Sequence, residues 1–165
     1  MKEIEFKIKG LMMDPLTNSP IVVLQDTNSE TLLPIWVGIF EANAIALQIE
    51  KVDTPRPMTH DLIKGLLLNL DAKVTKIVVT ELKDNTFYAL IFLETGGKVI
   101  TVDARPSDAI ALALRTESPI FVTDDVITKS ASSAAATPST ERSTPEEIRK
   151  WLENLNPDDL GKYKM

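Results

Sequence analysis

The chain begins with a regular alternation of apolar and charged residues. Over residues 3–9, Ile4, Phe6 and Ile8 alternate with lysine and glutamate, which is the period of a strand with one buried face. Apolar runs bounded by turn residues predict six more strands, at 21–24, 32–37, 73–82, 86–94, 98–102 and 119–122. A hairpin turn is expected at 26–29, and the strands at 73–82, 86–94 and 98–102 are expected to form a meander.

Three segments change to the period of an amphipathic helix. The first covers 41–51, the second starts at Thr59, a favourable N-cap, and the third covers 107–115. We expect the second helix to bury a stripe of apolar residues, namely Leu62, Ile63, Leu66, Leu67 and Leu70. One further helical turn is expected at 124–129.

One pattern occurs twice. Residues 35–47 and 100–112 align without a gap: each has an apolar strand, a short polar break and the string Ala-Ile-Ala-Leu. Either a strand–helix unit is duplicated and places two polar corners in related positions, or a generic buried-helix string occurs twice. Binding sites are common where strands lead into helices, so both corners are candidate sites.

The end of the chain differs in composition from the rest. Residues 130–143 are almost entirely small and polar, which predicts a mobile linker. Thr144, Pro145 and Glu147 form a capping-box pattern, and a helix at 145–155 would place Trp151 on its apolar side. We therefore expect a domain at 1–129, a linker at 130–143 and a helical tail at 144–165.

Composition narrows the class of protein. The 165 residues are 44% hydrophobic and 25% charged, as in ordinary globular chains. There is no cysteine, which excludes disulfides, thiolate metal sites and cysteine nucleophiles. The net charge of −6 argues against broad, non-specific affinity for nucleic acid. Neither a signal peptide nor a membrane span is expected, so the predicted location is cytoplasmic and no membrane partner is expected.

The second polar corner holds the densest charge. Asp103 ends a strand, Arg105 can bind a phosphate through parallel hydrogen bonds, and Asp108 lies in the first turn of a helix, where it can hold a metal or favour the helix dipole. The alternative is a structural Arg–Asp network that locks the corner.

Four other residues are candidates for chemistry. His60, the only histidine, and Asp61 open the second helix, where His60 can act as a general acid. Arg56 is held between two prolines and can contact phosphate, and Glu41 begins the first helix, where it can be a ligand or a base. The alternatives are a surface histidine, a loop arginine paired with a carboxylate, and a helix cap.

Several familiar motifs are absent from the sequence. It contains no glycine-rich phosphate loop, no Gly-x-Ser-x-Gly elbow and no paired zinc histidines. Aromatic residues make up 5% of the chain, and no basic–aromatic run indicates a base-stacking platform. Trp36 and Phe40 are accordingly expected in the core.

Five segments in order resemble the bifunctional nuclease family, over residues 1 to about 130. They are Leu33-Pro34-Ile35-Trp36-Val37-Gly38, Glu41-Ala42-Asn43-Ala44-Ile45-Ala46, Pro55-Arg56-Pro57-Met58-Thr59-His60-Asp61-Leu62, Phe87-Tyr88-Ala89 and the run from Val102 to Ala113. The resemblance implies an α+β fold with a mixed, largely antiparallel sheet, three packed helices, and a homodimer. It also implies DNase and RNase activity.

The leading hypothesis is therefore a nuclease that hydrolyses RNA and DNA. The expected catalytic residues are His60, Asp61, Asp103 and Asp108, with Arg56 and Arg105 binding substrate. Glu41, Asp103 and Asp108 are the expected ligands of Mg²⁺ or Mn²⁺. The competing hypothesis is a homodimeric regulatory or interaction module without catalytic activity, in which the polar corners are ion-pair networks.

Overall fold

The computed structural model describes residues 1–136. The predicted tail at 144–165 and most of the predicted linker lie outside these residues. Seven strands and four helices follow one another along the described chain: β1 (Glu3–Met13), β2 (Pro20–Asp26), β3 (Leu32–Trp36), α1 (Ile39–Ile49), α2 (Thr59–Asn69), β4 (Lys73–Lys83), β5 (Thr86–Thr95), β6 (Lys98–Ala104), α3 (Pro106–Thr116), β7 (Ile120–Thr123) and α4 (Asp124–Ala136).

The strands form a single mixed sheet in the order β3-β2-β1-β7-β4-β5-β6. All neighbours are antiparallel except β4 and β7, so the predicted α+β class is confirmed. Two meanders, β1–β2–β3 and β4–β5–β6, lie on either side of the short β7 and end at the two sheet edges. Each edge strand leads into a helix, α1 after β3 and α3 after β6.

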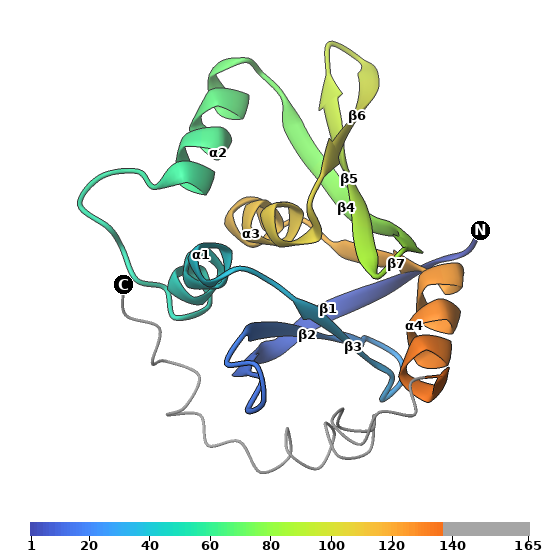
Figure 1. Cartoon of the computed structure of the whole chain (residues 1–165). Coiled ribbons are helices and arrows are strands. Elements are labelled where there is room, and N and C mark those ends of the chain that lie inside the picture. The colour runs from blue at the N-terminus through green and yellow to red at the C-terminus, as the bar shows by residue number, and fades with distance from the viewer. Residues whose placement is uncertain (137–165) are drawn as a thin grey trace.

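The core lies between the sheet and the helices α1 and α3, which contact each other (Figure 1). Ile45 of α1 and Ile110 of α3 are fully buried with Val22 and Ile77 of the sheet. Burying each such side chain contributes about 1.5–3 kcal/mol. Because both helices enter this core from the ends of opposite edge strands, packing brings the two strand–helix junctions together.

Helix α2 covers α3 rather than the sheet. Its predicted buried stripe is partly wrong: Ile63 and Leu67 pack against the core, but Leu62, Leu66 and Leu70 are exposed. The helix is apolar around most of its circumference while only α3 is available to cover it. The other apolar side of α2 therefore faces outward.

The prediction of a core position for Trp36 and Phe40 is wrong, because both side chains are exposed. They flank the turn at Gly38, where the chain leaves the sheet edge. The buried positions of α1 begin only at Ala42.

Helix α4 is longer than the single turn predicted at 124–129 and continues through Ala136 into the stretch expected to be a linker. Its alanines favour helix, and the fully buried Val126 anchors its start. The helix lies away from α1–α3, near the N-terminus (Figure 1). No helix in residues 1–136 is long and apolar enough to cross a membrane.

Candidate active site

The two polar corners meet through one ion pair. Arg105, the N-cap of α3, places Nη1 2.8 Å from Oε1 of Glu41 in the first turn of α1. The sequence repeat placed Glu41 and Arg105 in related positions, and the contact between α1 and α3 makes them neighbours. Space at this junction depends on Gly38, because a Cβ there would overlap the Glu41 carboxylate.

Arg105 also holds Asp108, three residues further along α3. Its Nε donates to Oδ2 at 2.8 Å and its Nη2 donates to Oδ1 at 3.2 Å. This two-point geometry is the strong form of an arginine–carboxylate pair. The hydrogen bonds with Asp108 are the main reason that the pKa of Arg105 is raised above its ordinary value, and the Glu41 pair adds to them.

His60 extends this chain of contacts to α2. Its Nε2 lies 3.0 Å from Oδ1 of Asp108, and its side chain is only 9% exposed. Burial alone would raise the pKa of Asp108, but hydrogen bonds from Arg105 and His60 outweigh it and hold that pKa below 3.8. Asp108 is thus a carboxylate at neutral pH and can only accept, so Nε2 of His60 is the donor in this bond, and Nδ1 is the acceptor nitrogen whenever the imidazole is neutral.

Asp61 belongs to a different cluster. Its Oδ1 accepts from Nε of Arg115 at 2.6 Å and its Oδ2 accepts from the Met58 backbone N–H at 3.0 Å. Burial opposes ionisation, but the Met58 and Arg115 hydrogen bonds lower the pKa of Asp61 below its ordinary value. With both oxygens engaged, Asp61 fixes the start of α2 and hence the position of His60.

Arg115 is the residue that the sequence reasoning missed. It is buried, and besides Asp61 it donates through Nη1 to the Ala111 carbonyl and through Nη2 to the Ala44 carbonyl. One guanidinium therefore joins α1, α2 and α3. The available signal was its position seven residues after Asp108, on the same face of a helix that is otherwise apolar.

Arg56 lies in an open cavity of about 300 Å³ between the end of α1 and the start of α2. Gln48, Val52 and Asp61 line its sides, and the loop 53–57 closes one end. Thr54 Oγ1 donates to the Arg56 carbonyl at 2.8 Å, which fixes the loop backbone. Within residues 1–136 the Arg56 guanidinium makes no ion pair with the chain, so it remains available to a ligand.

Asp103 is not part of the His60–Asp108–Arg105–Glu41 chain. It is exposed on the edge strand β6, opposite Leu90 of β5. Nor do the described residues contain a group of three or more histidine or carboxylate side chains placed to hold a metal ion. The oxygens of Glu41 and Asp108 instead bind the Arg105 guanidinium, which does not fit a shared metal site.

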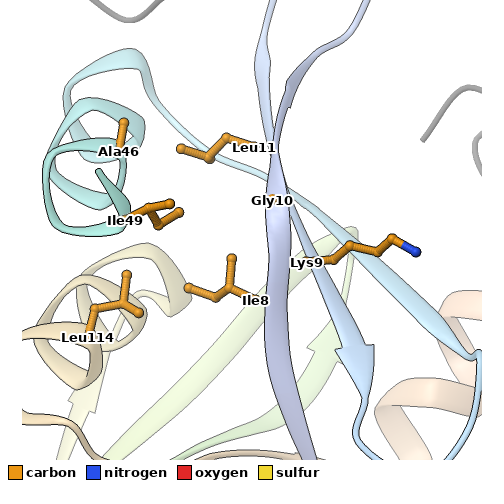
Figure 2. A pocket seen from close by; sticks show the side chains of 7 residues that line it. All are labelled: Ile8, Lys9, Gly10, Leu11, Ala46, Ile49 and Leu114. Carbon is orange, nitrogen blue, oxygen red and sulfur yellow. The ribbon is translucent and has the colours of Figure 1, made fainter. Parts of the chain in front are cut away.

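A second cavity, of about 230 Å³, lies between β1 and the helices α1 and α3. Figure 2 shows apolar side chains facing one another across it, while Lys9 points away to the other side of the strand. The described residues that line it are Ile8, Lys9, Gly10, Leu11, Ala46, Ile49 and Leu114. They hold no carboxylate or histidine, so the chemistry of the protein is better sought at the polar chain.

Sequence comparisons place this arrangement in a family. A sequence model of the bifunctional nuclease domain matches residues 22–135. The chain belongs to this family. An uncharacterized protein of Mycobacterium tuberculosis is 35% identical over 162 residues, which cover 94% of this chain and 97% of that protein.

Plant relatives carry the family name. Bifunctional nuclease 2 of Oryza sativa subsp. japonica is 33% identical over 107 residues, 62% of this chain and 33% of that protein. Bifunctional nuclease 1 of Arabidopsis thaliana is 28% identical over 116 residues, 68% of this chain and 36% of that protein. The match thus covers about a third of the length of each plant protein.

In this bifunctional nuclease domain, the structure brings together four of the seven predicted site residues: Glu41, His60, Arg105 and Asp108. A buried histidine oriented by a carboxylate is an arrangement suited to proton transfer. The adjacent arginine is suited to binding an anion. Asp61 and Arg56 lie at the neighbouring cavity, and Asp103 is separate from both groups.

Proposed function

We propose that the chain hydrolyses phosphodiester bonds of RNA and DNA, with His60 as the proton-transferring residue. Two things support this: membership of the bifunctional nuclease family, and the hydrogen bond that aligns His60 on the Asp108 carboxylate. The second observation carries the assignment of the residue, because the bond to Asp108 fixes the tautomer. In that tautomer a neutral imidazole has its lone pair on Nδ1, as a general base requires.

In the proposed reaction, Nδ1 of His60 takes a proton from the water that attacks phosphorus. The new P–O bond forms as the bond to the leaving oxygen breaks, and the imidazolium returns the proton to that oxygen. Asp108 stabilises the imidazolium through Nε2. A guanidinium has five N–H groups, and Arg105 uses three of them on Glu41 and Asp108. The remaining two can donate to the phosphoryl oxygens, where charge develops.

Arg56 would bind a neighbouring phosphate of the same strand. Its cavity borders Asp61, the residue after His60, and its guanidinium does not have to leave an ion pair first. The catalytic role expected for Asp103 and Asp61 remains a prediction, as does the contribution of Arg105 to binding.

Assistance by Mg²⁺ or Mn²⁺ also remains a prediction. Because the Glu41 and Asp108 carboxylates are both bound to Arg105, the proposed mechanism assigns no step to a metal. Cleavage measured with Mg²⁺, with Mn²⁺ and with a chelator tests the requirement directly. A melting temperature that rises with cation concentration would indicate a bound ion.

The expected homodimer and cytoplasmic location belong to the same proposal. Exposed leucines on α2 and exposed Val99, Ile100 and Val102 on the edge strand β6 support a dimer, because apolar patches of this kind favour association. The competing hypothesis, a regulatory module without activity, is supported by the number of ion pairs that join α1, α2 and α3.

The test is cleavage of end-labelled RNA and DNA by the wild-type chain and by His60→Ala, purified identically. We expect a loss of about 100-fold or more in the variant, the range of a general acid–base contribution, with the circular dichroism spectrum retained. Asp125→Ala, on the distant helix α4, is the matched control and should cleave normally. Equal cleavage by His60→Ala and wild type would reject His60 as the proton-transferring residue, and no cleavage by either protein would favour the regulatory module.

A further inference from the structure

An exposed apolar patch lies at the junction of β3 and α1. Phe40 is 72% exposed, Ile39 57% and Trp36 49%, although burying aromatic rings is among the most favourable contributions to folding. Three large apolar side chains within five residues are thus exposed, and nothing else in residues 1–136 covers them. We call these three residues the junction patch.

The junction patch is held in place rather than loosely attached. The Trp36 indole donates through Nε1 to Oδ2 of Asp14, at 3.1 Å, which fixes one edge of its ring. Phe40 lies in the first turn of α1, directly before Glu41, whose carboxylate is bound to Arg105. The ion pair that orients the active-site arginine therefore also fixes the helix turn that carries Phe40.

Arg105 indicates what covers the patch, because it is paired with Glu41, the residue directly after Phe40. The Arg105 side chain is 64% exposed, and two of its five N–H groups have no partner within residues 1–136, so they can bind an anion. An aromatic surface next to a fixed cation matches a nucleotide, whose base stacks on the ring while its phosphate meets the arginine. In a duplex, the bases already stack on one another and present only their edges, so this surface fits unpaired bases.

We propose that the junction patch is a base-stacking site that directs the domain to single-stranded nucleic acid. This inference rests on the proposed function and adds the substrate class. One base stacks on Phe40, with Trp36 beside it, and the phosphate of a neighbouring nucleotide lies at Arg105.

Salt dependence follows from the same geometry. The chain carries a net charge of −6, so most of the binding free energy must come from stacking rather than from release of counterions. For single strands the slope of log K against log salt is about −0.7 for each phosphate neutralised. One phosphate contact, at Arg105, predicts a shallow slope of about −0.7, and a second, at Arg56, makes it about −1.4.

The experiment measures binding by tryptophan fluorescence in full-length chain. Because the sequence has two tryptophans, Trp151→Phe leaves Trp36 as the single reporter, and His60→Ala in the same chain prevents cleavage. Oligothymidylate should quench the Trp36 emission, and a duplex of equal length should bind at least tenfold more weakly. Phe40→Ala should raise Kd for the single strand about 5- to 150-fold, which corresponds to about 1–3 kcal/mol for a stacked base.

Phe40→Leu is the matched variant, since it keeps an apolar side chain without an aromatic face. Tyr88→Ala, an exposed aromatic position on β5, controls for general loss of apolar surface and should bind normally. Equal Kd for Phe40→Leu and wild type, or equal affinity for duplex, would overturn the stacking proposal. So would a change of sedimenting mass in Phe40→Ala without a change in Kd, because the junction patch would then be a subunit interface.

Failure of this inference is distinguishable from failure of the proposed function. If Phe40→Ala binds and cleaves single and double strands as the wild type does, while His60→Ala alone loses cleavage, the nuclease proposal survives and the stacking site does not. If His60→Ala cleaves normally, the role of His60 fails, and if the wild type does not cleave, the nuclease assignment fails, whatever the binding data show.

Discussion

Asp61→Ala is the sharpest test of how this site is held together. The substitution removes the partner of Arg115, whose side chain is 3% exposed, while Asp61 itself is 35% exposed. It also removes the acceptor of the Met58 N–H at the start of α2. The guanidinium would then keep its two bonds to helix carbonyls but lose its counter-charge.

The expected magnitude follows from these contacts. A hydrogen bond to a charged group contributes about 1.5–3 kcal/mol, and a helix N-terminal cap about 1 kcal/mol. Breaking a fully buried ion pair costs about 3–5 kcal/mol, but water reaches the exposed part of Asp61 and reduces that figure. We therefore expect Asp61→Ala to lower the free energy of unfolding by about 2–4 kcal/mol.

Urea denaturation followed by circular dichroism measures this change. The deciding comparison is a double-mutant cycle between Asp61 and Arg115. In Arg115→Met/Asp61→Ala the buried charge is gone, so the double variant should be more stable than Asp61→Ala alone. Asp125→Ala, which breaks the exposed Lys129–Asp125 pair of α4, is the control and should leave the urea midpoint unchanged. A cost below about 1 kcal/mol for Asp61→Ala, or a double variant less stable than the single one, would refute the reasoning.

Two further predictions concern acid and the Gly38 junction. Asp61 and Asp108 both have a pKa lowered from 3.8. Their stabilisation is therefore complete above the unfolded value and is lost as the pH falls through the lower folded values. Acid titration should show a smaller loss of stability over that range in Asp61→Asn and Asp108→Asn than in wild type; an unchanged acid profile would contradict this. Gly38→Ala places a Cβ on the Glu41 carboxylate, which can turn away but then loses its ion pair with the exposed Arg105. The change should therefore cost about 1 kcal/mol or less in urea unfolding. In a Glu41→Ala chain it should be nearly neutral, and an equal cost in both chains would reject this explanation.

Most strands and helices of this fold can be predicted from the sequence because their hydrophobic residues recur with a clear period. Strict alternation at Ile4, Phe6 and Ile8 and the apolar stripe of α1 arise from local geometry that each segment meets on its own. The predictions of burial were wrong where the neighbouring elements, and not the segment itself, decide whether a side chain is covered. The leucines of α2 and the aromatic residues at Gly38 are apolar, but no element within residues 1–136 lies over them.

In the candidate site, too, the sequence identified several of the residues but not how they pair. The sequence alone identified Glu41, His60, Arg105 and Asp108 as unusual polar residues at helix starts, because charge at such positions departs from the apolar pattern around it. It could not tell that Asp61 pairs with Arg115 and not with His60, because that depends on which face of α2 meets α3.

The strands, the helices α1–α3 and the two charged strand–helix corners can be predicted from the chain, since they depend on residue type and on spacing along one segment. That α1 and α3 leave opposite sheet edges and pack together is seen only in the folded protein. That packing brings Glu41 to within 2.8 Å of a guanidinium far along the chain. Pairing of distant segments is set by the summed packing of the whole core, so no local pattern specifies it.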